Sequence, residues 1–286
     1  MSIQSFDPVR YKAGQRREWD SASTGWKNWW QQIEEALQPV SERMMELADI
    51  RTGQQVLDIA TGIGEPAITA ARRVGPSGRV TAIDFSPRML DIGRERAVDL
   101  GLRNIAFREM DADNLDFPEK SFDLIFCRFG LMYLTDHLSA LGKIRKLMLP
   151  GGRLVAAVWG PPQRVPFASV PMGVIMRELQ LQPPPPGTPG VFSLADTHCV
   201  EHLLRQAGFS HVHTEPLAVI MDWSSPEEFV RFQREALTQI NALLGKYPAE
   251  RQAELWHAIT KALRQYSAAD GRCHLENEAI VLAGRR

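Results

Sequence analysis

The sequence lacks the features that mark several large classes of protein. Lys and Arg together number 33 and Asp and Glu 34, so there is no basic excess to displace counterions from phosphates. We therefore expect no nucleic-acid partner. No stretch approaches the roughly 20 apolar residues that a membrane span needs. The first twenty residues are polar and hold no apolar run typical of a secretory signal.

Cysteine is scarce, with only three residues, at positions 127, 199 and 273. An odd, sparse set argues against a disulfide framework, and no pair has metal-ligand spacing. His198 and His202 stand four residues apart, but no third ligand lies nearby, so we predict no metal site. A cytoplasmic protein is the expectation that follows.

The 286 residues divide by pattern into three segments. Residues 1–50 predict an N-terminal cap of two helices, in which Trp26, Trp30, Ile33 and Leu37 recur at helical spacing. We expect this stripe to pack on its own domain; docking on a membrane or lining a substrate lid are alternatives. Residues 51–160 predict an α/β core. Residues 161–286 predict its completion, with a Pro-rich connector (161–195) and a helical insertion (about 223–276).

Short apolar runs alternate with helical segments after residue 54, which predicts βαβ units and a parallel sheet. The fold class expected is α/β, with a Rossmann-like, doubly wound sheet of seven strands. The strands are expected at residues 54–60, 79–84, 104–110, 121–127, 153–159, 211–223 and 278–284.

Two glycines occur where the first strand turns into a helix. Gly62 and Gly64 allow positive φ and a close approach of the backbone to a ligand. Asp84 ends the next strand, twenty residues after Gly64, where a carboxylate can bind both hydroxyls of a ribose. This much fits a dinucleotide as well as a simpler nucleoside.

Three neighbouring residues favour a cationic, zwitterionic nucleoside over a diphosphate. Asp58, four residues before Gly62, can receive the ammonium group of an amino acid. Glu65 would repel a pyrophosphate at the helix N-terminus, and Pro66 removes one N–H group that such a site would use.

A set of motifs in this order resembles the class I S-adenosylmethionine-dependent methyltransferases. The branch that it resembles includes quinone C-methyltransferases and natural-product methyltransferases, and the resemblance covers about residues 50–160. It implies that the last strand lies antiparallel at the sheet edge. The motifs are Asp58-x-x-x-Gly62-x-Gly64, Asp84, Asp111-Ala112-Asp113, Ser121-Phe122-Asp123 and Leu149-Pro150-Gly151-Gly152.

The resemblance implies S-adenosylmethionine as the cofactor and a role for each matching position. The methionine part would meet Asp58, the backbone of Ala60 and Gly62, and the carbonyl of Arg128, with Gly64 in the same turn. Asp84 would bind the ribose. The adenine would meet the residues Phe85, Met89, Asp111 and Ala112.

The acceptor is expected above the C-terminal edge of the sheet, where inserted segments supply an apolar wall. His137 and Tyr133 are the catalytic candidates, and His137 is the predicted base, because the helix N-terminus favours a neutral imidazole. The residues predicted to line the substrate pocket are Tyr11, Trp19, Trp26, Trp29, Phe129, Met132, Phe167 and Met172.

The predicted function is methyl transfer from S-adenosylmethionine to O, N or C of a small apolar or aromatic molecule, by a monomer or homodimer. Two alternatives stay open. One is an NAD-linked reductase, although no Tyr-x-x-x-Lys pair occurs. The other is a catalytically silent module that binds the nucleoside.

Overall fold

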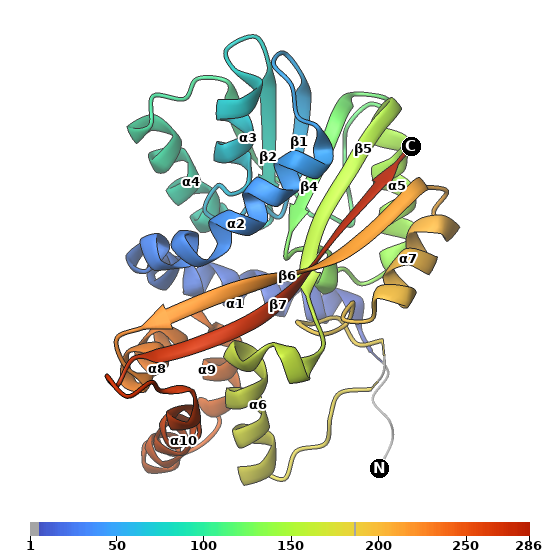
Figure 1. The fold of residues 1–286 in the computed structure, drawn as a ribbon. Helices are drawn as coiled ribbons and strands as arrows, with labels where there is room; N and C mark the ends of the chain where they lie inside the picture. Colours follow the sequence, from blue (N-terminus) through green and yellow to red (C-terminus); the bar gives the residue numbers. More distant parts are fainter. Residues whose placement is uncertain (1–5, 186) are drawn as a thin grey trace. The chain divides into compact units, whose positions relative to one another are not determined.

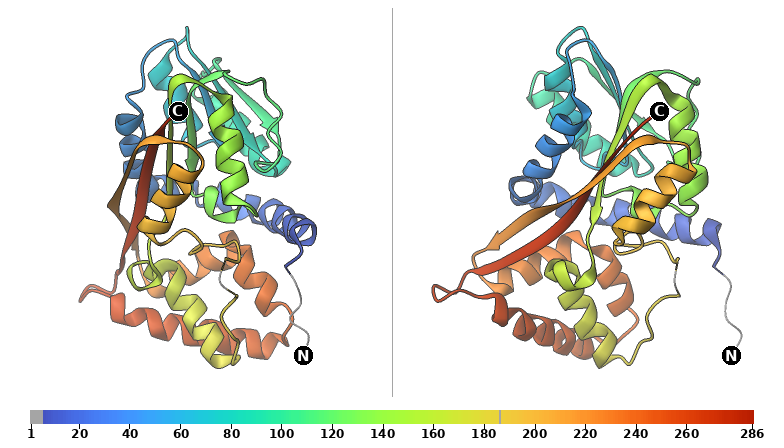
Figure 2. Two further views of the ribbon diagram at one scale, coloured as in Figure 1. Left: turned by 90° about the vertical axis from the view of Figure 1, so that its right-hand side faces the viewer. Right: turned by 45° about the vertical axis from the view of Figure 1, so that its right-hand side comes forward.

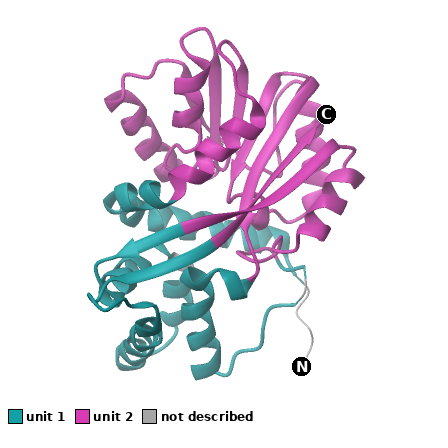
Figure 3. Cartoon of the chain, viewed as in Figure 1, with its two compact units in different colours: residues 1–36, 162–188, 220–277 teal, residues 37–161, 189–219, 278–286 magenta. Residues whose placement is uncertain are grey.

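The computed structural model describes residues 6–185 and 187–286. These residues form two compact units, each assembled from separate stretches of the chain (Figure 3). Unit 1 comprises residues up to 36, 162–188 and 220–277, and unit 2 comprises residues 37–161, 189–219 and 278–286.

A seven-stranded sheet confirms the predicted α/β fold (Figure 1). Its strand order is β3-β2-β1-β4-β5-β7-β6, and β1 to β5 pair in parallel. The order in which the strands follow one another along the chain reverses between β1 and β4, and this is the switch point at which such sheets bind ligands. The strands are β1 (Gln55–Ile59), β2 (Arg79–Asp84), β3 (Ile105–Glu109), β4 (Phe122–Arg128), β5 (Met148–Trp159), β6 (Ser210–Trp223) and β7 (Cys273–Arg285).

The position of the last strand departs from the expectation. β7 pairs antiparallel with β5, as predicted, but it lies between β5 and β6, and β6 is the edge strand. The prediction of an edge position for β7 was therefore wrong. Burial gives the reason: β7 is almost continuously buried from Ala279 to Leu282, whereas β6 alternates exposed and half-buried residues over most of its length. A strand covered on both faces favours an inner position in the sheet, with a neighbour on each side.

The helices of unit 2 are α3 (Ala67–Val74), α4 (Pro87–Asp99), α5 (His137–Leu147), α7 (Thr197–Gln206) and the second part of α2 (Trp30–Ala48). Right-handed crossovers and the switch in strand order put α3 and α4 on one face of the sheet and α5 on the other. Helices α5 and α7 lie beside each other (Figure 2). The side chains of Ser86, Asp136 and Asp196 cap α4, α5 and α7 by accepting backbone N–H groups.

Unit 1 is mainly helical. Trp29 ends α1 and packs edge-on against Trp223 and Phe232, with ring centroids 5.7 and 5.9 Å apart. The predicted tryptophan stripe is thereby split, since Trp26 lies on α1 and Ile33 on α2. The helices are α1 (Pro8–Asn28), the start of α2, α6 (Pro166–Glu178), α8 (Pro226–Ala236), α9 (Thr238–Leu244) and α10 (Ala249–Leu263).

The described helices include none that is both long enough and apolar enough to cross a bilayer.

Candidate functional site

The predicted cofactor residues all belong to unit 2. Parallel strands bring their carboxyl ends to one edge of the sheet, so the residues at and after the ends of β1, β2, β3 and β4 gather there. These residues are Asp58, Ala60, Gly62, Gly64, Asp84, Phe85, Met89, Asp111, Ala112 and Arg128.

Asp58 is a completely buried carboxylate near the end of β1. Its Oδ2 accepts the Ala67 N–H of α3 at 3.1 Å, while its Oδ1 has no partner of normal hydrogen-bond geometry among the described residues. Burial raises the pKa of Asp58 to about 7, against the opposing effects of the Thr61 hydroxyl and the Arg128 guanidinium. A buried acceptor of this kind gains a partner when a cationic donor binds.

The glycine turn adopts the conformations that its sequence predicts. Gly62 has φ +55° and Gly64 φ +103°, both in the left-handed half of the map. A Cβ on Gly62 would meet no other atom within 4 Å, so that side of the turn is open. A Cβ on Gly64 would lie 2.9 Å from Ile68 and 3.3 Å from the Cα of Gly93. Gly64 therefore allows α3 and α4 to pack closely, in addition to forming the turn.

Asp84 holds the glycine turn in place. Its Oδ2 accepts the Gly62 N–H at 2.9 Å, and its Oδ1 accepts the Ser86 N–H at 2.9 Å. A carboxylate oxygen has two lone pairs and can accept more than one hydrogen bond. The carboxylate thus combines a structural contact with the acceptor capacity that ribose binding requires.

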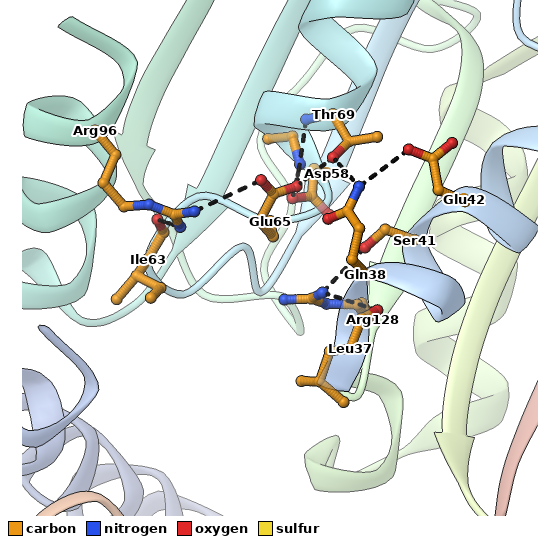
Figure 4. Close-up of polar contacts among 11 residues, drawn as sticks. Leu37, Gln38, Ser41, Glu42, Asp58, Ile63, Glu65, Thr69, Arg96 and Arg128 are labelled. Carbon is orange, nitrogen blue, oxygen red and sulfur yellow. Dashed lines mark hydrogen bonds and ion pairs between the residues drawn. The ribbon is translucent and has the colours of Figure 1, made fainter. Parts of the chain in front are cut away.

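Glu65 is buried and engaged with its own unit (Figure 4). Its Oε2 accepts the N–H and hydroxyl groups of Thr69, at 3.2 and 2.7 Å, and its Oε1 lies 3.7 Å from Arg96. Arg96 also donates to the Ile63 carbonyl at 2.7 Å. Because Arg96 partly balances this charge, Glu65 argues less strongly against a pyrophosphate than its sequence position suggests. Pro66 is the N-cap of α3.

The adenine side contains residues of β3 and α4. Asp111 follows β3, and its Oδ1 accepts the Asp113 N–H at 2.9 Å while its Oδ2 accepts the Asn114 side chain at 3.2 Å. Ala112 and Phe85 are half-buried, and Met89 on α4 is buried. The predicted adenine contacts stay predictions on this geometry.

Arg128 ends β4 and is buried, with 8% of its surface exposed. Its Nη1 donates to the Ser41 hydroxyl at 3.0 Å and to the Leu37 carbonyl at 3.5 Å, both on α2. Sequence reasoning assigned a role only to the main-chain carbonyl of this residue. A basic side chain at the end of a mostly apolar strand was the available signal for its contacts with α2.

The turn after β4 lies directly against the end of β1. A Cβ on Gly130 would lie 2.6 Å from the Ala60 Cβ and 2.7 Å from the Cys127 sulfur. Ala60 and Phe129 both have positive φ, 57° and 59°, an unfavourable conformation for residues with a side chain. Strained backbone therefore occurs directly after each of the two strands that border the switch point.

His137 begins α5, with Asp136 as its N-cap. Its Nε2 is buried without a partner among the described residues, and His137 lines a small apolar pocket together with Leu131, Leu203 and Leu282. The pKa of His137 is lowered, chiefly by burial, which favours the neutral imidazole; the sequence-based prediction attributed this effect to the helix N-terminus instead. Tyr133, the other catalytic candidate, is half-buried in the 3₁₀ turn Leu131–Tyr133.

The predicted substrate-lining residues fall in both units. Phe129 and Met132 belong to unit 2, where Phe129 stacks on Trp159 with centroids 4.2 Å apart. Trp29 is a buried core residue of unit 1, and its Nε1 donates to Glu235 at 2.7 Å. The remaining residues also belong to unit 1 and are Tyr11, Trp19, Trp26, Phe167 and Met172.

The residues present fit the amino-acid end of S-adenosylmethionine. The buried, unpartnered Oδ1 of Asp58 suits an ammonium group, and the open side of Gly62 leaves room for a ligand against the backbone.

Residues 38–168 match the sequence model of the ubiE/COQ5 methyltransferase family. A ubiquinone/menaquinone biosynthesis C-methyltransferase of Cellvibrio japonicus is 43% identical over 119 residues, which are 41% of this chain and 48% of the relative. One of Pseudomonas fluorescens is 38% identical over 127 residues, 44% of this chain and 50% of the relative. The matched region thus spans about half the length of these relatives. The predicted resemblance to methyltransferases is confirmed for this region.

Solved structures support the fold. The YcgJ protein of a Bacillus species has a TM-score of 0.57 at 18% identity, covering 86% of this chain and 97% of that protein. A phosphoethanolamine N-methyltransferase of Haemonchus contortus has a TM-score of 0.56 at 19% identity, covering 93% of this chain and 57% of that protein. At this identity the likeness is one of architecture.

Proposed function

We propose that the protein transfers a methyl group from S-adenosylmethionine to O, N or C of a small apolar or aromatic molecule. The match of residues 38–168 to a methyltransferase family supports this activity. The relatives named for ubiquinone and menaquinone biosynthesis favour an aromatic, quinone-related acceptor.

The observation that carries the proposal is the buried carboxylate at the switch point. Asp58 has one oxygen bonded to the N-terminus of α3 and the other without a partner, beside an open glycine turn. A diphosphate would gain nothing from an acceptor there, whereas the ammonium group of a methionine-derived nucleoside would donate to it.

The cofactor would supply a sulfonium-bound methyl group that is already activated for displacement. The task of the chain is then to align the acceptor atom with that carbon and to exclude water. Such alignment contributes roughly 7–11 kcal/mol to catalysis in well-oriented systems. Asp58 and Asp84 would fix the amino-acid and ribose ends of the nucleoside, and the resemblance implies that Asp111 orients the adenine.

We propose His137 as the base for acceptors that must lose a proton. Its neutral imidazole and unpartnered Nε2 are compatible with accepting one, and Tyr133 stands four residues earlier as the second candidate. The test is turnover of the His137→Ala variant once an acceptor is known; a rate near that of the wild type would remove this role.

The cofactor assignment is tested by calorimetric titration with S-adenosylmethionine, S-adenosylhomocysteine and NADH. Asp84→Ala is expected to weaken binding of the first two by about 1.5–3 kcal/mol, because hydrogen bonds to a charged acceptor are lost. Asp99→Ala, an exposed position on α4, is the matched control and should bind normally. Tight binding of NADH in place of the sulfur nucleosides would favour the reductase alternative.

We also propose that the protein acts in a reducing, cytoplasmic compartment, as a monomer or homodimer. The supporting observation is that its cysteines are unpaired, including the exposed Cys199.

A further inference from the structure

We infer that Arg96 is a positioning residue for the cofactor, because its guanidinium group holds the glycine turn (residues 61–65) in one conformation. Arg96 acts through the backbone of Ile63, the residue between the two glycines of the turn. This inference rests on the proposed function, since it assumes that S-adenosylmethionine binds at the turn.

Helix α4 packs directly on the glycine turn. A Cβ on Gly93 would lie 3.3 Å from the carbonyl carbon of Ile63 and 3.3 Å from the nitrogen of Gly64, so the helix backbone itself closely approaches the turn. Arg96 follows Gly93 by three residues, and residues at this spacing lie on one face of a helix. The same face of α4 therefore supplies both the close backbone contact and the guanidinium group.

Two charged side chains of opposite sign hold the backbone of the turn. Asp84, at the end of β2, accepts the Gly62 N–H at 2.9 Å. Arg96 donates to the Ile63 carbonyl at 2.7 Å (Figure 4). Hydrogen bonds of this kind, with one charged partner, are roughly twice as strong as those between neutral groups.

The glycines make such contacts necessary. Gly62 and Gly64 have φ of +55° and +103°, but glycine reaches many other backbone conformations at little cost. Contacts from outside the turn therefore select the conformation that binds. Without the donor on the Ile63 carbonyl, the binding conformation should be populated less, and the apparent affinity falls by the same fraction.

Glu65 gives Arg96 a second, purely structural role. Its Oε1 lies 3.7 Å from Arg96, and its Oε2 accepts the N–H and hydroxyl groups of Thr69 on α3. The side chains of Arg96 and Glu65 are only 13% and 5% exposed, so water screens this pair poorly. Removing Arg96 therefore has two effects: the buried Glu65 charge loses this cation, and the Ile63 carbonyl loses its donor.

The experiment separates the two effects with Glu65→Gln, which removes the buried charge and keeps an oxygen for Thr69. Calorimetric titration with S-adenosylmethionine and thermal unfolding are measured for the wild type, Glu65→Gln, Arg96→Met and the double variant. Arg96→Met should lower both the melting temperature and the affinity. In the Glu65→Gln background it should lower the melting temperature much less but still weaken binding about tenfold, the lower end of the range for one hydrogen bond to a charged group.

Arg94→Met is the matched control. Arg94 is an exposed arginine of the same helix, and it donates to the Phe107 carbonyl of β3 at 3.2 Å, away from the glycine turn. This variant should bind S-adenosylmethionine as the wild type does.

A purely structural role of Arg96 predicts a different pattern. The loss of affinity would then disappear in the Glu65→Gln background together with the loss of melting temperature, and this result would overturn the inference while leaving the proposed function intact. The comparison of Glu65→Gln with the double variant still decides the matter if Arg96→Met alone fails to fold. Failure of the wild type to bind S-adenosylmethionine would instead overturn the proposed function, and with it this inference.

Discussion

The buried carboxylate of Asp58 should make cofactor binding depend on pH near neutrality. Burial raises its pKa to about 7, so about half of the unliganded protein carries a protonated Asp58 at pH 7. A ligand ammonium group favours the ionised form. The apparent affinity should therefore be about twofold below its maximum at pH 7 and about tenfold below it at pH 6. Binding at pH 7 should release about half a proton.

Calorimetry between pH 5.5 and 7 measures this dependence, because the amino group of the ligand stays protonated below the ordinary α-amino pKa of roughly 7.7–8.0. At pH 7, titration in two buffers of different ionisation enthalpy gives the number of protons released. Asp58→Asn keeps an oxygen for the Ala67 N–H but cannot ionise. It should bind S-adenosylmethionine more weakly at pH 7 and show a much flatter profile between pH 5.5 and 7. A wild-type affinity that is constant from pH 5.5 to 7, or an unchanged slope in Asp58→Asn, would refute the reasoning.

The same raised pKa predicts a cost in stability. The folded state holds the Asp58 proton more tightly than the unfolded state, in which the carboxyl has its ordinary pKa of 3.8. The free energy of unfolding that this tighter proton binding contributes is fully present below about pH 4 and is lost as pH rises towards 7. The shift from 3.8 to about 7 corresponds to roughly 4 kcal/mol. The melting temperature of the wild type should be lower at pH 8 than at pH 5. This decrease should be smaller in Asp58→Asn.

Further predictions concern the glycines and the histidine of unit 2. Gly62→Ala places its Cβ in open space but at φ +55°, so it should lower the free energy of unfolding by about 1–2 kcal/mol. Because that open side is where the ligand would lie, the affinity for the cofactor should fall more than tenfold, as measured by titration. Gly130→Ala should lower the free energy of unfolding by about 1–3 kcal/mol, because its Cβ would lie 2.6 Å from Ala60; unchanged denaturant unfolding would contradict the packing. His137 has a lowered pKa, so its stability contribution is present above its unfolded pKa of about 6.5 and is lost as pH falls below it. His137→Leu should flatten thermal stability between pH 5 and 6.5, and an unaltered profile would contradict burial of the imidazole.

The features that depend on residues close together in the chain could be predicted from the sequence. The glycine turn follows from two residues that tolerate positive φ, and both adopt it. The cap of α5 follows from an Asp placed before an apolar helical pattern. Alternation of strands and helices led to the parallel sheet, because crossovers of one hand leave few arrangements. The acidic residues at successive strand ends therefore meet at one edge.

Contacts distant in sequence decided the rest. The inner position of β7 depends on its pairing with both β5 and β6, which no local pattern encodes. The direction of the Arg128 side chain depends on α2, about ninety residues earlier in the chain, because Ser41 and the Leu37 carbonyl receive it there. The raised pKa of Asp58 likewise arises from complete burial, which exists only after the sheet and helices have assembled around it. Residue types set which chemistry was available, and packing determined which groups were buried and which of them faced one another.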